Sequence, residues 1–237
     1  MKVFYIADTS LTNKSAYSQH VIKMCDAFGQ NITDNTILIV PYEKEKINFS
    51  KLKKRFMLNS IHQLKIKSIL KTKISNFLER LIFGFKASIF LKDKRKSLII
   101  TRSLYASIFL SLLRINHFLE IHTELKSFTK FCLIGLNFIN SKYIIKIIFI
   151  SKALKKFYNI NNKKIMILHD GTDPKNFKKG KKITRIKTAT YIGSFYKGRG
   201  IELILKLAKN FNKINFNLYG KSNKLSVNNI KNLKIFN

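Results

Sequence analysis

The sequence has few acidic residues. Its 237 residues include 46 Lys and Arg but only 12 Asp and Glu, so the formal net charge is +34. An anionic partner, such as a membrane surface, nucleic acid or a phosphate-bearing substrate, would suit this charge. A coding bias toward Lys, Ile and Asn could also raise the lysine content, although it does not explain why acids are scarce. Both interpretations stay open at this stage.

Cysteine and long apolar runs are scarce too. Cys25 and Cys132 lie far apart without a C-x-x-C partner, which excludes a disulfide framework and predicts buried thiols in a reducing compartment. The most apolar stretches (81–91, 104–113 and 131–150) are too short or contain Lys, Asn or Ser. A membrane-spanning helix needs about 20 apolar residues, and no segment is typical of a signal peptide. We therefore expect a protein that is soluble or lies on one membrane face.

Apolar residues make up 46% of the chain, enough for a sizeable core, and they alternate between strand and helix patterns. Strands are predicted at 2–7, 36–41, 97–101, 117–122, 144–151, 164–171, 188–193, 213–220 and 232–237. Helices are predicted at 16–28, 103–113, 124–139, 152–158 and 200–210, with a mostly helical, very basic region at 50–96. Because the strands are apolar on both faces, the pattern predicts a parallel α/β sheet covered on each side.

A polar, basic stretch at 173–187 interrupts this alternation and predicts a linker. The element order predicts an N-terminal Rossmann-like domain over 1–180 and the first part of a second one over 181–237. The basic region 50–96 alternates cations with Leu, Ile and Phe, which predicts a face toward an anionic membrane. A solvated helical face would have the same pattern. The cations of region 50–96 that carry this prediction are Lys51, Lys53, Lys54, Arg55, Lys65, Lys67, Lys71 and Lys73.

The segment "TATYIGSFYKGRGIELILKLAK" (188–209) has the layout of a phosphate site. A strand stops at Gly193, a glycine-rich loop with Lys197 and Arg199 follows, and a helix begins near Gly200. Glycines let the backbone approach a ligand, and a helix N-terminus offers free N–H groups to an anion. The loop fits neither the P-loop nor the G-x-G-x-x-G pattern. An ordinary strand–turn–helix corner with surface cations would look the same.

This segment resembles the first strand–loop–helix of the C-terminal domain in family-4 glycosyltransferases of the GT-B fold. Upstream, "HDGTDPKNF" (169–177) is similar to that family's NGVD…F segment and "FISKALKKFY" (149–158) to its ISEALK turn. "EIHTE" (120–124) and "TRSLYAS" (101–107) are similar to family strand ends. The similarity runs through the chain in the family's order. It implies an incomplete GT-B protein, because the family's E-x7-E segment has no counterpart here.

The resemblance implies a retaining glycosyltransferase that moves a sugar from a nucleotide-sugar donor to a polysaccharide, lipid-linked or other cell-envelope acceptor. It implies no metal and no other cofactor. It also implies a location in the cytoplasm, with a peripheral position on the inner face of an anionic membrane as one form of it. The second interpretation is a non-catalytic basic α/β module that binds nucleic acid or an anionic membrane. Nucleic acid is the less expected partner, because no RRM, KH, helix-turn-helix or zinc pattern occurs.

By resemblance, His122 contacts the transferred sugar, although a His bonded to a neighbouring loop would fit the same position. Glu120 is expected to meet a backbone or cationic partner. The donor diphosphate would lie in the loop described above, where Ser194 stands in place of the usual arginine. The implied donor-phosphate residues are Gly193, Ser194, Lys197, Arg199 and Gly200. The first loop lacks the family's glycine pair and offers Ser10, Thr12, Asn13 and Ser15 toward donor or acceptor.

Overall fold

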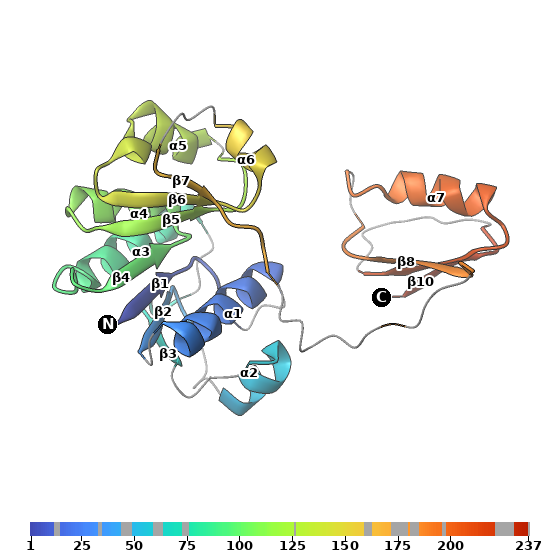
Figure 1. Ribbon diagram of the computed structural model, residues 1–237, viewed down its shortest axis with the longest axis horizontal. Helices are drawn as coiled ribbons and strands as arrows, with labels where there is room; N and C mark the ends of the chain where they lie inside the picture. The colour runs from blue at the N-terminus through green and yellow to red at the C-terminus, as the bar shows by residue number, and fades with distance from the viewer. Residues whose placement is uncertain are drawn as a thin grey trace. The chain divides into compact units, whose positions relative to one another are not determined.

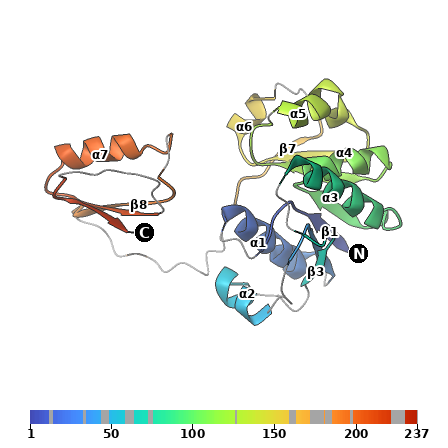
Figure 2. The same ribbon diagram turned by 180° about the vertical axis from the view of Figure 1, so that it is seen from behind.

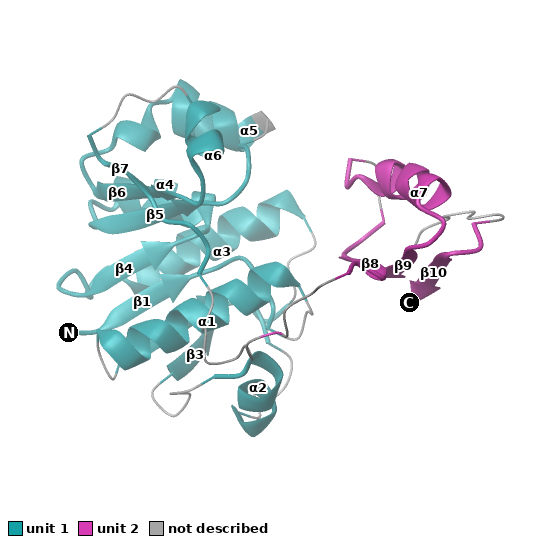
Figure 3. Ribbon diagram, turned by 45° about the vertical axis from the view of Figure 1, so that its right-hand side comes forward, with its two compact units in different colours: residues 1–176 teal, residues 177–237 magenta. Residues whose placement is uncertain are grey.

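The chain forms two compact units, unit 1 (Met1–Asn176) and unit 2 (Phe177–Asn237), in a computed structural model (Figure 3). The structure describes residues 1–11, 15–32, 35–43, 49–58, 64–72, 76–125, 127–158, 163–171, 180, 185–195, 198–220 and 230–236. Most of the predicted linker 173–187 lies outside these residues. Each unit is described by itself.

Unit 1 is a seven-stranded parallel sheet in the order β3-β2-β1-β4-β5-β6-β7. Its strands are β1 (Val3–Ile6), β2 (Thr36–Val40), β3 (Leu64–Ser68), β4 (Leu98–Thr101), β5 (His117–Ile121), β6 (Ile144–Phe149) and β7 (Ile165–Ile167). The first strand is central, because Val3 pairs with Thr36 of β2 on one side and with Leu98 of β4 on the other. The order reverses between β1 and β4, the point where open α/β sheets bind ligands.

Helices cover both faces of this sheet (Figures 1 and 2). They are α1 (Ala16–Asn31), α2 (Phe49–Phe56), α3 (Phe77–Phe90), α4 (Leu104–Leu112), α5 (Ser127–Lys130) and α6 (Lys152–Lys156). Alternate residues of β1 separate the two cores. Tyr5 packs in the cluster that contains Cys25 of α1, whereas Phe4 packs with Phe83 of α3 and Ala106 of α4. This alternation is the period of a strand buried on both faces.

Helices α3 and α4 lie side by side and touch through their backbones (Figure 2). A Cβ atom on Gly84 would lie 2.8 Å from the amide nitrogen of Ala106. The hydroxyl of Ser88 donates to the carbonyl of Gly84 at 2.8 Å and lies 3.2 Å from the carbonyl of Ala106. Glycine is therefore required here by the close approach of the two helices.

Two predicted elements differ from the structure. The mostly helical region 50–96 contains strand β3, because residues 64–68 alternate buried and more exposed side chains at the sheet edge. The helix predicted over 124–139 is broken into α5, a π-helical turn (Phe131–Gly135) and a 3-10 turn (Phe138–Asn140). Asn137 adopts a left-handed conformation between the two turns, which ends the regular helix.

In its described residues, unit 2 contains a three-stranded parallel sheet and one helix, α7 (Ile201–Asn210). Its strands are β8 (Thr188–Ile192), β9 (Asn215–Tyr219) and β10 (Leu233–Phe236), in the order β10-β9-β8. Ile201 and Ala208 of α7 are buried against Phe216 and Leu218 of β9. The predicted fold class is confirmed: one parallel α/β sheet domain is followed by the first strands and helix of a second.

Candidate functional site

Chemically versatile side chains gather at the carboxyl edge of the unit 1 sheet. Asp8 follows β1, Arg102 follows β4, and His122 follows β5. These three strands are neighbours in the sheet, so residues far apart in the sequence converge at one point. The point coincides with the switch in strand order, where loops diverge and leave room for a ligand. The described residues around it line a cavity of about 300 Å³.

This cavity has a mixed lining of charged, aromatic and hydroxyl side chains. Its walls include Asp8, Tyr17, Arg80, Arg102, Tyr105, Glu120, His122 and Thr129. A larger, more open cavity of about 690 Å³ adjoins it and shares His122, Thr123 and Thr129. His122 therefore belongs to the walls of both cavities. A pocket with a few convergent polar groups is the usual form of a small-molecule site.

His122 is held at the strand end by a buried carboxylate. Its Nε2 lies 3.4 Å from Oε2 of Glu120, and the Glu120 side chain is only 5% exposed. The same oxygen accepts a hydrogen bond of 2.5 Å from the hydroxyl of Tyr5 in β1. Glu120 thus has a histidine and a tyrosine as partners, where a backbone or cationic partner was expected. The arrangement connects the sheet core directly to the ring of His122.

The pKa values of Glu120 and Tyr5 reflect both burial and their hydrogen bond. Burial raises the pKa of Glu120, but the hydrogen bonds from His122 and Tyr5 lower it by more than burial raises it, so the pKa of Glu120 lies below its usual value. Burial, followed by the charge of Glu120, raises the pKa of Tyr5 well above its usual value. Glu120 is therefore an ionised acceptor and Tyr5 a neutral donor near neutral pH.

A second imidazole faces His122. The ring centroids of His20 and His122 are 4.7 Å apart and nearly perpendicular. Nη1 of Arg102 donates to Nδ1 of His20 at 2.8 Å, while Nε2 of His20 lies 3.2 Å from the Asp170 carboxylate. Burial and the Arg102 charge lower the pKa of His20 below its usual value. The guanidinium of Arg102 also stacks over the ring of Tyr17 at 4.0 Å, which fixes its plane.

Asp8 is the carboxylate with an unused oxygen. Its Oδ1 is buried and has no hydrogen-bond partner among the described residues, while its backbone N–H donates to the hydroxyl of Tyr17 at 3.1 Å. Burial raises the pKa of Asp8 to about 6, against the opposing effects of Ser103, Arg80 and Arg102. A buried acceptor without a partner is costly, so it is normally kept where a ligand supplies the missing donor.

His20, Glu120 and His122 have the composition of a metal site, and one ligand atom of each lies within 4.8 Å of the others. The hydrogen bonds oppose this use. A metal-bound imidazole normally donates its other N–H to an acceptor, yet Nδ1 of His20 already accepts from the Arg102 guanidinium. That guanidinium would also repel an incoming cation. We therefore interpret the three residues as a hydrogen-bonded cluster.

Of the four predicted first-loop residues, the structure describes Ser10 and Ser15. The side chain of Ser15 accepts from the backbone N–H of Ser18 and caps the N-terminus of α1. Ser10 is half-buried. Thr12 and Asn13 lie outside the described residues. The structure therefore gives Ser15 a role in starting the helix, as its residue type favours.

The predicted donor loop lies in unit 2 at the start of α7. Gly198 and Gly200 have φ angles of 89° and 76°, which only glycine adopts easily, and Gly200 leaves the helix N-terminus without a side-chain cap. Arg199 is exposed between them. Gly193 directly follows strand β8, and the carbonyl of Ser194 accepts from the hydroxyl of Tyr191. Lys197 lies outside the described residues.

Sequence reasoning singled out His122 but missed Asp8, His20 and Arg102. The signal available for Asp8 and Arg102 was their position: each directly follows a predicted strand that is apolar on both faces. Nothing in the sequence marks His20, because it lies within α1 and reaches the site only through the packing of that helix.

No family model matches the chain, and no curated protein matches it. Solved structures do. The lipopolysaccharide outer core galactosyltransferase WaaB is 15% identical, with a TM-score of 0.63 over 94% of this chain and 62% of WaaB. The chain thus spans less than two thirds of WaaB. The fold is that of the GT-B glycosyltransferases.

Two further structures show the range of proteins with this fold. A variant of S. aureus TarM in complex with fondaparinux, α-GlcNAc-glycerol and UDP is 12% identical, with a TM-score of 0.64 over 100% of this chain and 78% of TarM. The UDP-GlcNAc 2-epimerase from Neisseria meningitidis, bound to UDP-GlcNAc, is 14% identical, with a TM-score of 0.51 over 100% of this chain and 72% of the epimerase. At these identities the likeness concerns the fold.

Proposed function

We propose that the protein is a family-4 glycosyltransferase, which transfers a sugar from a nucleotide-sugar to a polysaccharide, lipid-linked or other cell-envelope acceptor. The observation that carries this proposal is the pocket of unit 1, where His122, Glu120 and Asp8 meet at the switch point of a GT-B sheet. Its neighbours in fold include a galactosyltransferase and a protein crystallised with UDP. Polar groups that both donate and accept suit a ligand with many hydroxyls.

Each unit has a separate task in this proposal. His122 contacts the transferred sugar, and the unpartnered Oδ1 of Asp8 accepts from a sugar or acceptor hydroxyl. The uncapped N-terminus of α7, together with Arg199 and Lys197, holds the donor diphosphate. Fixed positive charge at this position stabilises the leaving group without a metal ion.

The reaction replaces one C–O bond with another. The acceptor oxygen bonds to the anomeric carbon while the bond from that carbon to the diphosphate breaks, and the bonding electron pair leaves with the diphosphate. In the retaining reaction that we propose, the acceptor proton passes to the departing diphosphate oxygen. The charged loop and the helix N-terminus therefore stabilise the transition state more than the bound substrate, because negative charge develops on the departing diphosphate.

The proposal includes a cytoplasmic location with peripheral contact to the inner face of an anionic membrane. Among the described residues, no helix is both long enough and apolar enough to cross a bilayer. The net charge of +34 favours an anionic surface.

The test is a transfer assay with radiolabelled UDP- and GDP-sugars and a cell-envelope lipid extract as acceptor. We expect label in the extract and a loss of about tenfold to a hundredfold with His122→Ala. His169→Ala is the matched control, because His169 is exposed and its Nδ1 lies 2.9 Å from the carbonyl of Ile150, outside the walls of the two cavities. NMR of the donor in the same reaction would detect a 2-epimer instead. Formation of the 2-epimer would contradict the proposal, and so would a lack of label in the extract with every donor tested.

A further inference from the structure

One side of α3 presents apolar side chains to solvent. Leu78 is 64% exposed, and Ile82, Phe85 and Ile89 are 45%, 48% and 45% exposed. Their spacing of four, three and four residues places them in a single stripe along the helix. At 1.5 Å per residue the stripe is about 16 Å long. We call these four residues the α3 stripe.

The helix that carries the stripe is firmly built. Asn76 and Glu79 form a complete capping box at its N-terminus, and Phe83, Gly84, Ala87 and Ser88 are buried on its other side. The stripe is therefore not the side that holds α3 to the sheet. It is an apolar surface that stays about half exposed or more at each of its four residues, of the kind that marks an interaction site.

The stripe continues onto α4 and ends in a basic rim. The ring of Phe85 contacts Phe109 of α4 at 5.4 Å, and Leu112 at the end of that helix is 58% exposed. Exposed cations surround this end of the surface: Lys86, Lys92, Arg95, Lys96 and Arg114. Arg95 donates to the carbonyl of Leu113, so the rim is tied to both helices. The acids of the segment are Glu79, used in the cap, and Asp93.

Helix α3 also reaches the pocket. Arg80, on another side of the helix, lines the cavity of Asp8 and His122. Phe77 contacts Tyr105 at 5.6 Å and Phe128 at 5.1 Å, and Tyr105 is itself part of the cavity wall. The first turn of α3 thus joins an aromatic pocket edge to the exposed stripe. A molecule held on the stripe would have its neighbouring groups near the pocket.

We propose that the α3 stripe and its basic rim dock the protein on an anionic lipid surface, which presents a lipid-linked acceptor to the pocket. An apolar stripe about one helix long, flanked by cations, is the composition of a helix lying in a membrane interface. A second copy of a chain with a charge of +34 would be repelled. Nucleic acid is bound mainly through its phosphates, which an apolar stripe does not contact. The statement about the acceptor rests on the proposed function, whereas the docking does not.

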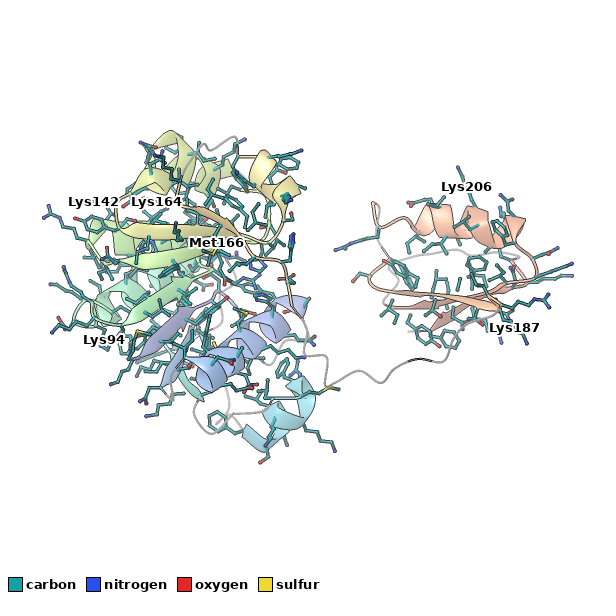
Figure 4. All side chains as sticks on the ribbon, viewed as in Figure 1. Lys94, Lys142, Lys164, Met166, Lys187 and Lys206 are labelled. Carbon is teal, nitrogen blue, oxygen red and sulfur yellow. The ribbon has the colours of Figure 1, made fainter. Side chains whose placement is uncertain are left out.

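Helix α2 is not this surface, although its cations were part of the sequence prediction. Its apolar residues Leu52 and Phe56 are buried in the core, and Phe49 alone in the helix is an exposed apolar residue beside Lys51, Lys53, Lys54 and Arg55, so α2 has no apolar stripe like that of α3. Cations are in fact distributed over both units, for example Lys94 and Lys142 in unit 1 and Lys187 and Lys206 in unit 2 (Figure 4). What distinguishes the α3 stripe is exposed apolar area beside the charge.

The test is co-sedimentation of the full chain with phosphatidylcholine vesicles, with and without phosphatidylglycerol. We expect binding to the anionic vesicles, and a loss of at least about tenfold in partitioning for the variant carrying Ile82→Ser and Ile89→Ser. The matched control carries Ile186→Ser and Leu203→Ser, which remove exposed apolar side chains of 65% and 60% exposure in unit 2. Lys86→Gln and Lys92→Gln should each lower partitioning by about fivefold.

Three results would overturn the docking proposal: equal binding to neutral vesicles, unchanged binding by the Ile82/Ile89 serine variant, or a dimer in solution that this variant disrupts. Circular dichroism checks that each variant is folded. Vesicle binding requires no transferase activity, so the two proposals fail separately. If the protein binds vesicles through α3 but transfers no sugar, only the proposed function is wrong.

Discussion

The hydroxyl of Tyr5 donates a hydrogen bond of 2.5 Å to the carboxylate of Glu120, which lies 115 residues away in the sequence. Both side chains are buried, and the same carboxylate oxygen faces Nε2 of His122 at 3.4 Å. Because an ionised carboxylate accepts hydrogen bonds but donates none, Glu120 favours the proton on Nε2 of His122. The core of the sheet thereby determines how the site presents its imidazole.

Tyr5→Phe should destabilise the protein by about 1–3 kcal/mol, because the buried Glu120 carboxylate loses a donor and keeps its charge. Urea unfolding followed by circular dichroism measures this change. Tyr219→Phe is the control, because it removes the same hydroxyl group from a tyrosine that is 41% exposed. Equal stability of Tyr5→Phe and wild type would show that the hydrogen bond contributes little.

Asp8→Asn should stabilise the protein near neutral pH, because it removes a buried charge with an unpartnered oxygen. The folded pKa of Asp8 is about 6, above its ordinary value of 3.8, so the folded state keeps a proton that the unfolded state has lost. Its contribution to stability is full below about pH 4 and declines as the pH rises through 6, by about 3 kcal/mol in all. Thermal melting across this pH range tests the sign.

His117 contributes with the opposite sign in the same pH range. It is buried, lies 2.8 Å from the hydroxyl of Ser107 and 2.9 Å from the carbonyl of Ile115, and burial lowers its pKa from 6.5 to about 4. Its stabilisation is full above about pH 6.5 and is lost as the pH falls toward 4. We expect Asp8→Asn to lose stability more steeply than wild type on acidification from about pH 7 to about pH 5. Parallel curves would contradict the assignment of Asp8, and an Asp8→Asn curve that stays flat over this range would contradict that of His117.

Gly84→Ala should cost about 1–3 kcal/mol in unfolding free energy, because the new methyl group meets the backbone of α4. The Cβ atom would lie 2.9 Å from the carbonyl carbon of Tyr105, and backbone cannot move aside cheaply. Gly171→Ala is the matched control, since no atom lies within 4 Å of its Cβ position. A similar urea midpoint for the two variants would mean that α3 and α4 can separate without loss.

Arg199→Ala and Lys197→Ala should each weaken binding of UDP or GDP by about 1–3 kcal/mol, as expected for charge-assisted contacts to a diphosphate. Isothermal titration calorimetry measures the affinities. Lys206→Ala serves as the control, because Lys206 is exposed further along α7 and away from the helix start. If all three variants bind alike, the start of α7 is an ordinary helix corner rather than a donor-phosphate site.

The sequence by itself determined the fold class and most of the element order, because apolar runs and helical spacing are local properties of the chain. His122 was found in this way, since it directly follows a clear strand. Strand β3 was missed because the short segment "LKIKS" lies in a basic region whose alternation of cations and apolar residues also fits an amphipathic helix. Its pairing with β2, which makes it a strand, is not visible in the local sequence. The same holds for the break at Asn137, where one left-handed residue decides the helix end.

Only the tertiary structure decided which side chains meet. Asp8, His20, Arg102 and Glu120 converge because β1, β4 and β5 are consecutive in the sheet and α1 packs against it. Strand order is a long-range property, and no local pattern encodes it. The α3 stripe has the same origin: the sequence shows an apolar helix, but only the packing of Gly84 and Ala87 against the core leaves Ile82 and Ile89 in solvent.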